Sequence, residues 1–170
     1  GSIVDRISES IFFTPQEFEQ SDHHIKGSFN EFGQFTGTVT IYGEQKREYV
    51  LSWPEGLNKP VSCGHFKINL AVIMGTARES KLPNALWQEI YHKTNKIGGL
   101  YIYRDGIRVL PYGDSDVDFL HIEQRRSKSA SQAFFSYRRM LGSIELTKKS
   151  NYALHEKAGR EGFIENKAYK

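Results

Sequence analysis

One stretch decides the fold: Gly98-Gly99-Leu100-Tyr101-Ile102-Tyr103-Arg104-Asp105-Gly106-Ile107-Arg108-Val109-Leu110-Pro111-Tyr112-Gly113. Asp105-Gly106 is typical of a two-residue hairpin connection, because a type I′ turn needs positive φ at both central positions. Strand-forming residues lie on both sides of it. The spacing predicts that Tyr103 faces Arg108 and that Ile102 faces Val109, with the apolar pair toward the core and the Tyr–Arg pair outside.

Upstream of this hairpin, apolar residues recur at a period of two. The alternation predicts three antiparallel strands within residues 25–29, 35–41 and 49–53, with turn residues at 30–33 and 43–45 between them. A longer strand follows at 64–74. Its last residues are all apolar, which is typical of a strand buried on both faces.

Two helices are predicted before the meander and one before the hairpin. Residues 3–13 carry isoleucines four apart, which indicates a short amphipathic helix. Thr14-Pro15-Gln16-Glu17 then has the residues of a capping box, with Phe13 and Phe18 placed as a hydrophobic staple. Residues 83–96 form the third predicted helix, which Gly98 ends.

After the hairpin, we expect a strand at 118–124, a basic loop at 125–139, a strand at 142–147 and a terminal helix from Glu161 onward. The class is therefore α+β, with an antiparallel or mixed sheet. Residues 1–20 are expected to be a peripheral helical lead-in, and Gly1-Ser2 resembles the scar of a cleaved tag. Residues 21–170 are expected to form one domain.

Composition excludes several classes of protein. The 170 residues are 38% hydrophobic and 13% aromatic, which excludes intrinsic disorder, and the formal net charge is +3. A single cysteine, Cys63, excludes a disulfide framework and a cysteine-based metal site. No signal peptide or long apolar run occurs, so we expect a cytoplasmic protein without a membrane partner.

Two motifs carry a resemblance to a known family. Tyr103-Arg104-Asp105-Gly106, Arg108 and Pro111-Tyr112-Gly113-Asp114, followed by Asp118-Phe119-Leu120, form the first. Arg160-Glu161-Gly162-Phe163-Ile164-Glu165-Asn166 is the second. Together they resemble the region after the nucleotide-binding domain in bacterial ATPases of the gyrase B, heat-shock-chaperone, histidine-kinase and MutL superfamily (GHKL).

The resemblance implies the middle, or transducer, domain of such an ATPase. It implies the ribosomal-S5-domain-2-like fold, here preceded by the β-meander: a four-stranded sheet covered on one face by helices, with a left-handed β-α-β crossover. The function implied is non-catalytic coupling within a larger protein that binds ATP and magnesium. This chain has no Asp-x-Gly-x-Gly and no phosphate-binding Gly-x-x-x-x-Gly-Lys, so we expect it to hold neither cofactor. The implied partner is the N-terminal ATP-binding domain of the same polypeptide, and a homodimer of the full-length protein is compatible with it.

In that family the transducer domain contributes one cation to the γ-phosphate of the nucleotide. The candidates here lie in residues 125–139, which hold five basic and no acidic residues. Such a cation balances the charge on the transferring phosphoryl group. Lys128 lies in the middle of this segment, and the other candidates are Arg125, Arg126, Arg138 and Arg139. The alternative for each of these residues is that it is a solvated surface charge without a functional contact.

Two other functions remain open from the residues. The basic segment, with its interleaved Phe134, Phe135 and Tyr137, also suits a nucleic-acid-binding module, although core packing is the simpler role for such rings. The run Asp114, Asp116, Asp118 and Glu123 could hold Mg²⁺ in a nuclease, but turn formation suffices to explain the first two. The six histidines share no metal-ligand spacing.

Overall fold

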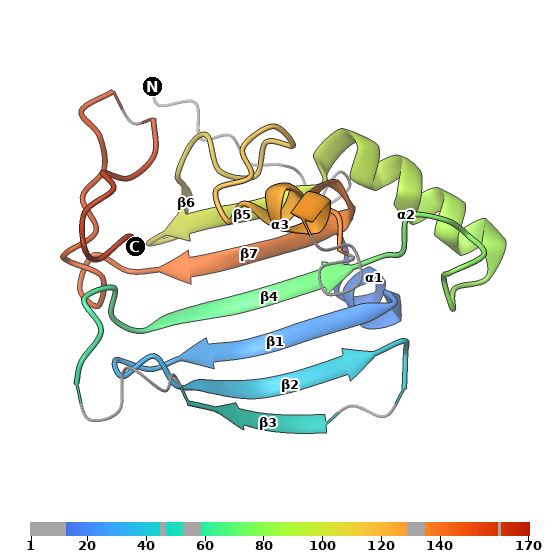
Figure 1. Ribbon diagram of the computed structural model, residues 1–170, viewed down its shortest axis with the longest axis horizontal. Helices are drawn as coiled ribbons and strands as arrows, with labels where there is room; N and C mark the ends of the chain where they lie inside the picture. Colours follow the sequence, from blue (N-terminus) through green and yellow to red (C-terminus); the bar gives the residue numbers. More distant parts are fainter. Residues whose placement is uncertain (1–12, 45–46, 53–58, 129–134, 160) are drawn as a thin grey trace.

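A seven-stranded mixed sheet forms the centre of the molecule (Figure 1). The computed structural model describes residues 13–44, 47–52, 59–128, 135–159 and 161–170. The strand order is β3-β2-β1-β4-β7-β5-β6, and only β5 and β7 are parallel neighbours. The predicted α+β class is confirmed. The strands are β1 His23–Phe29, β2 Phe35–Ile41, β3 Arg47–Leu51, β4 Phe66–Val72, β5 Gly99–Arg104, β6 Ile107–Arg108 and β7 Met140–Leu146.

The predicted meander is confirmed as β1, β2 and β3. Gly27 faces Gly37 across the β1–β2 pair, and a Cβ at either position would lie 2.7 Å from the ring of Phe35. The two glycines therefore leave the space that this ring occupies, and Phe35 is buried there. β4 is also as expected, because Ala71 and Val72 at its end are buried on opposite faces of the sheet.

The hairpin that the sequence predicts is also present. Asp105 and Gly106 have φ of 51° and 78°, as a type I′ turn requires. Tyr103 faces Arg108, and the Val109 amide donates to the Ile102 carbonyl at 2.8 Å. Ile102 and Val109 are buried as predicted. The Arg108 side chain, expected outside, is only 11% exposed.

Two of the predicted helices are confirmed. α1, Pro15–Gln20, begins with the expected capping box: Glu17 N–H donates to Thr14 Oγ1 and Thr14 N–H to the Glu17 carboxylate. α2, Asn84–Ile97, ends where the Gly98 amide donates to the Thr94 carbonyl. The helix predicted at 3–13 lies outside the described residues except for Phe13, whose ring is 6.2 Å from that of Phe18.

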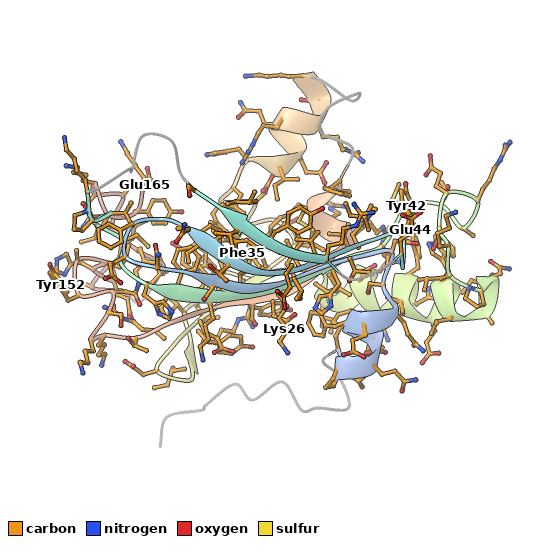
Figure 2. All side chains as sticks on the ribbon, turned by 90° about the horizontal axis from the view of Figure 1, so that it is seen from below. Lys26, Phe35, Tyr42, Glu44, Tyr152 and Glu165 are labelled. Atoms are coloured by element: carbon orange, nitrogen blue, oxygen red, sulfur yellow. The ribbon has the colours of Figure 1, made fainter. Side chains whose placement is uncertain are left out.

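Helices lie on both faces of the sheet, so the expectation of helices on one face is wrong. Figure 2 shows α1 and α2 on the side of Lys26, and α3, Ile122–Lys128, on the side of Phe35. Successive residues of β4 and β7 alternate between these faces. Ala71 and Leu141 pack in the α1–α2 cluster, whereas Val72 and Met140 pack with Phe119 and Ile122. The second layer exists because the long connection after β6 supplies these two apolar residues.

The connection between β5 and β7 has an unusual hand. The two strands are parallel neighbours, and the chain between them crosses the face that carries α3. Viewed with α3 in front, as in Figure 1, both strands run to the left and β7 lies below β5. This arrangement is a left-handed crossover, whereas almost all such crossovers in proteins are right-handed.

Two predicted elements near the C-terminus are wrong. Residues 118–124 do not form a strand, because the Asp118 carboxylate accepts the Glu123 amide at 2.8 Å and starts α3 there. The terminal helix expected from Glu161 is replaced by turns and an isolated bridge between Glu156 and Phe163. Gly162 has φ of 88°, which a right-handed helix does not allow.

Candidate functional site

The basic segment is partly helical rather than a loop throughout. Its first residues belong to α3, and its last three form a 3-10 helix, η2, at Tyr137–Arg139. Residues 129–134 between them, which include Phe134, lie outside the described part. The five candidate cations therefore divide into two groups: Arg125, Arg126 and Lys128 on α3, and Arg138 and Arg139 on η2.

Arg139 has a structural role, because its side chain is held by contacts to α2. Its Nη1 donates to Thr94 Oγ1 at 2.7 Å and to Asn95 Oδ1 at 2.8 Å, and its guanidinium lies 3.6 Å from the centre of the Tyr91 ring. Burial lowers the pKa of Arg139. These contacts fasten the start of β7 to α2, on the sheet face opposite α3, so Arg139 does not belong with the α3 cations.

Arg138 lies on the surface, and among the described residues it has one loose partner. Its Nη2 is 3.7 Å from the Asp116 carboxylate, and the two side chains are 67% and 86% exposed. An exposed ion pair of this length contributes little to stability. Arg138 is therefore a solvated charge with an acidic neighbour.

The three cations of α3 are all exposed, but their partners differ. Arg125 donates to the Leu120 carbonyl of the preceding turn. The Arg126 Nε lies 3.1 Å from the Glu123 carboxylate, one helical turn away. Lys128 makes no hydrogen bond or ion pair with any described residue. Within the described chain, Lys128 is thus the cation of α3 that an added anion meets without competition.

Glu123 connects the two parts of the basic segment. Its Oε1 accepts hydrogen bonds from Ser136 Oγ at 2.6 Å and from the Tyr137 amide at 2.8 Å. Its Oε2 pairs with Arg126. One carboxylate thereby holds α3 against η2 across thirteen and fourteen residues of sequence.

Tyr137 fixes η2 to the sheet. Its side chain is fully buried, and its hydroxyl oxygen accepts the Leu100 amide of β5 at 3.2 Å. Phe135 packs edge-on against the His23 ring, with the centroids 5.1 Å apart. The Tyr137 ring therefore lies inside the fold, and the half-buried Phe135 ring is packed against the sheet at His23.

The carboxylates considered for magnesium are separated by their contacts. Asp114 pairs with Arg108 at 2.8 Å, Asp116 lies near Arg138, and Asp118 caps α3. Among the described residues, no group of three or more His, Cys, Asp or Glu side chains is placed to hold a metal ion. Cys63 is half-buried, and burial raises the pKa of its thiol.

The two motifs that carry the family resemblance meet in space. The Phe163 amide donates to Tyr112 Oη at 3.0 Å, and the two rings are stacked with centroids 5.7 Å apart. The Arg104 guanidinium lies 5.8 Å from the centre of the Phe163 ring and also donates to the Asn151 carbonyl. A Cβ at Gly162 would lie 3.0 Å from Tyr112 Oη, so this approach favours glycine there.

Most of the remaining motif residues make other contacts within the fold. The Asp105 carboxylate accepts the Lys148 amide, and the Arg108 guanidinium covers the Tyr101 ring. Asn166 Oδ1 accepts the Ala168 amide in the final turn, while Glu161 is exposed. Arg160 lies outside the described residues.

A shallow hollow of about 520 Å³ lies beside the hairpin. Its walls come from the ends of β4, β5 and β7 on the sheet face that carries α1 and α2. Lys67, Glu145 and Tyr103 form one row across it, because Glu145 pairs with both of the others in register. Sequence reasoning missed this hollow, since its residues lie on three strands that are distant in the chain.

No protein-family model matches the chain, and no curated protein or solved structure is significantly similar to it. None of the described helices is both long and apolar enough to cross a membrane.

Proposed function

We propose that this chain is a non-catalytic coupling domain of a larger GHKL-type ATPase. In this proposal it relays the nucleotide state to the rest of the protein and supplies one cation to the γ-phosphate. The nucleotide and its magnesium are held by an ATP-binding domain of the same polypeptide. α3, with Lys128 near its end, is the part of this chain that meets the phosphate.

The left-handed β5-α3-β7 crossover carries the proposal. A connection of this hand is rare, and it is the feature that the motif resemblance implies for the transducer fold. The helix inside this crossover bears three exposed cations. The meeting of the two motifs at Tyr112 and Phe163 adds support, because it gives both of them a part in one packed cluster.

The chemistry of α3 suits a phosphate. Arginine and lysine are the side chains that make charge-assisted hydrogen bonds to phosphate oxygens. Lys128 can reach such an oxygen without breaking a contact to any described residue. Arg126 would have to give up its ion pair with Glu123 to bind the phosphate. A cation that arrives with the docking of one domain on another makes that docking depend on ATP.

The test is an alanine scan of Arg125, Arg126, Lys128, Arg138 and Arg139 in the full-length protein. Lys128→Ala should lower turnover by about 10²- to 10³-fold, as the loss of one preorganised transition-state contact does. Nucleotide affinity should fall much less. Arg138→Ala is the matched control and should keep wild-type turnover. Wild-type turnover in all five variants would contradict the proposal.

A nucleic-acid-binding module is the competing proposal for the same cations. It predicts that the chain binds DNA or RNA with an affinity that falls steeply with salt, because each phosphate contact releases a counterion. A titration at several salt concentrations separates the two functions. The coupling domain should give weak binding that Lys128→Ala leaves unchanged.

A further inference from the structure

Three contacts converge on the Glu123 carboxylate, and each comes from a part of the basic segment. Ser136 Oγ and the Tyr137 amide donate to Oε1, and Arg126 Nε lies beside Oε2. The side chain is 39% exposed, so it lies at the boundary between the packed layer and solvent. Hydrogen bonds to an ionised acceptor are shorter and stronger than neutral ones, in keeping with the 2.6 Å and 2.8 Å lengths.

The contacts form a path from the sheet to the cations. Tyr137 is anchored to β5 through the Leu100 amide and is fully buried. Glu123 binds the backbone of this anchored residue. α3 is only seven residues long and has no buried residue, so its own packing holds it weakly. Its position against η2 therefore depends on the Glu123 carboxylate and on the partly buried Ile122 beside it.

We infer that Glu123 is a positioning residue, which holds α3 against the anchored η2 and so sets where the α3 cations lie. This inference rests on the proposed function for the role of the cations, although the contact itself is independent of that function. A catalytic contact to a phosphoryl group depends steeply on position, and a displacement of about 1 Å can cost 10²-fold in rate. Loss of Glu123 should therefore act through Lys128 and Arg126 without any contact to the nucleotide.

Two substitutions separate the parts of this role. Glu123→Gln keeps the Oε1 acceptor for Ser136 and Tyr137 but loses the ion pair with Arg126. Glu123→Ala loses both. Glu145→Ala is the matched control, because Glu145 is an exposed glutamate on β7 that makes no ion pair with a described residue.

The first measurement is amide hydrogen exchange of Tyr137 in this chain, with the free energy of unfolding followed in parallel. Glu123→Ala should raise the exchange rate of the Tyr137 amide at least tenfold, while Glu123→Gln and Glu145→Ala should leave it near the wild-type rate. Unchanged exchange in Glu123→Ala would overturn the inference. A chain that no longer folds with alanine would overturn it too if the glutamine variant also failed to fold.

The second measurement is turnover of the full-length protein. Glu123→Ala should lower turnover by about 10- to 10²-fold with little change in nucleotide affinity, and Glu123→Gln should restore most of it. Turnover that falls in Lys128→Ala but not in Glu123→Ala overturns the positioning role and leaves the proposed function intact. If no α3 substitution changes turnover while the exchange result holds, the proposed function fails and Glu123 is a structural clamp only.

Discussion

At the scale of single residues, His23 shows how burial opposes a charge. Its ring packs 4.5 Å from that of Tyr42 and 5.1 Å from that of Phe135. Nδ1 accepts the Tyr42 amide, and the buried Nε2 has no hydrogen-bond partner among the described residues. Burial lowers the pKa of His23, and the neighbouring Asp22 opposes this only in part.

This lowered pKa predicts the pH dependence of stability. A histidine whose pKa is lower in the folded than in the unfolded state favours folding above about pH 6.5, and this contribution is lost as the pH falls. Urea denaturation at pH 7.5 and 5.5 should therefore show a loss of stability in acid that is smaller in His23→Gln. His155→Gln, an exposed histidine, should keep the wild-type difference. An equal loss in His23→Gln would assign the acid sensitivity to other groups.

Sequence reasoning explains few of the buried polar residues. Asn151 is fully buried; its Nδ2 donates to the Cys63 and His65 carbonyls, and its Oδ1 accepts the Thr147 amide. The identity of one asparagine in the sequence does not predict contacts to residues more than eighty positions away. Glu123 is similar, because its proximity to Arg126 is visible in the sequence but its bonds to Ser136 and Tyr137 are not.

At the scale of elements, the hairpin provides the sharpest prediction. Gly106 has φ of 78°, and a Cβ there would meet no atom within 4 Å. Gly106→Val should therefore destabilise the fold through backbone strain alone, by about 1–3 kcal/mol. Gly75→Val is the control, because Gly75 also faces open space but does not have positive φ. Equal denaturation midpoints for the two variants would show that the turn does not constrain the fold.

The elements that could be predicted are those with a local signal. Period-two alternation found β1, β2 and β4, and the Thr14 capping box found α1. Residues 118–124 contain three apolar residues, which predicted a strand, but they pair with no strand. Asp118 instead turns the chain into α3, and the partly buried Phe119 and Ile122 pack against the face of the sheet. A short stretch of apolar residues does not indicate whether a partner strand is available.

At the scale of the whole molecule, the proposed coupling role predicts what this chain lacks. The isolated chain should show no ATPase activity and no measurable affinity for ATP, since the proposal assigns the adenine and magnesium sites to another domain. Isothermal titration calorimetry with ATP and magnesium is the measurement. A micromolar dissociation constant would contradict the proposal and would place a nucleotide site within these 170 residues.

Long-range arrangement was the least predictable part. The composition and the order of elements gave the α+β class, but the second helical layer depends on α3, which the sequence pattern had assigned to a strand and a loop. The handedness of a crossover has no local signature in the sequence, so the left-handed β5–β7 crossover was expected only from the resemblance. The packing of Phe163 on Tyr112 likewise joins segments fifty-one residues apart.

The short helix η2 has a mechanical consequence. Tyr137 hydrogen-bonds to β5 and, through Glu123, to α3. Arg139, two residues later, contacts Tyr91, Thr94 and Asn95 of α2. These two sets of contacts lie on opposite faces of one sheet. Because packed interiors are stiff and transmit strain, a force on α3 reaches α2 through a lever only three residues long. The start of β7 is therefore the point through which strain on one face of the sheet reaches the other.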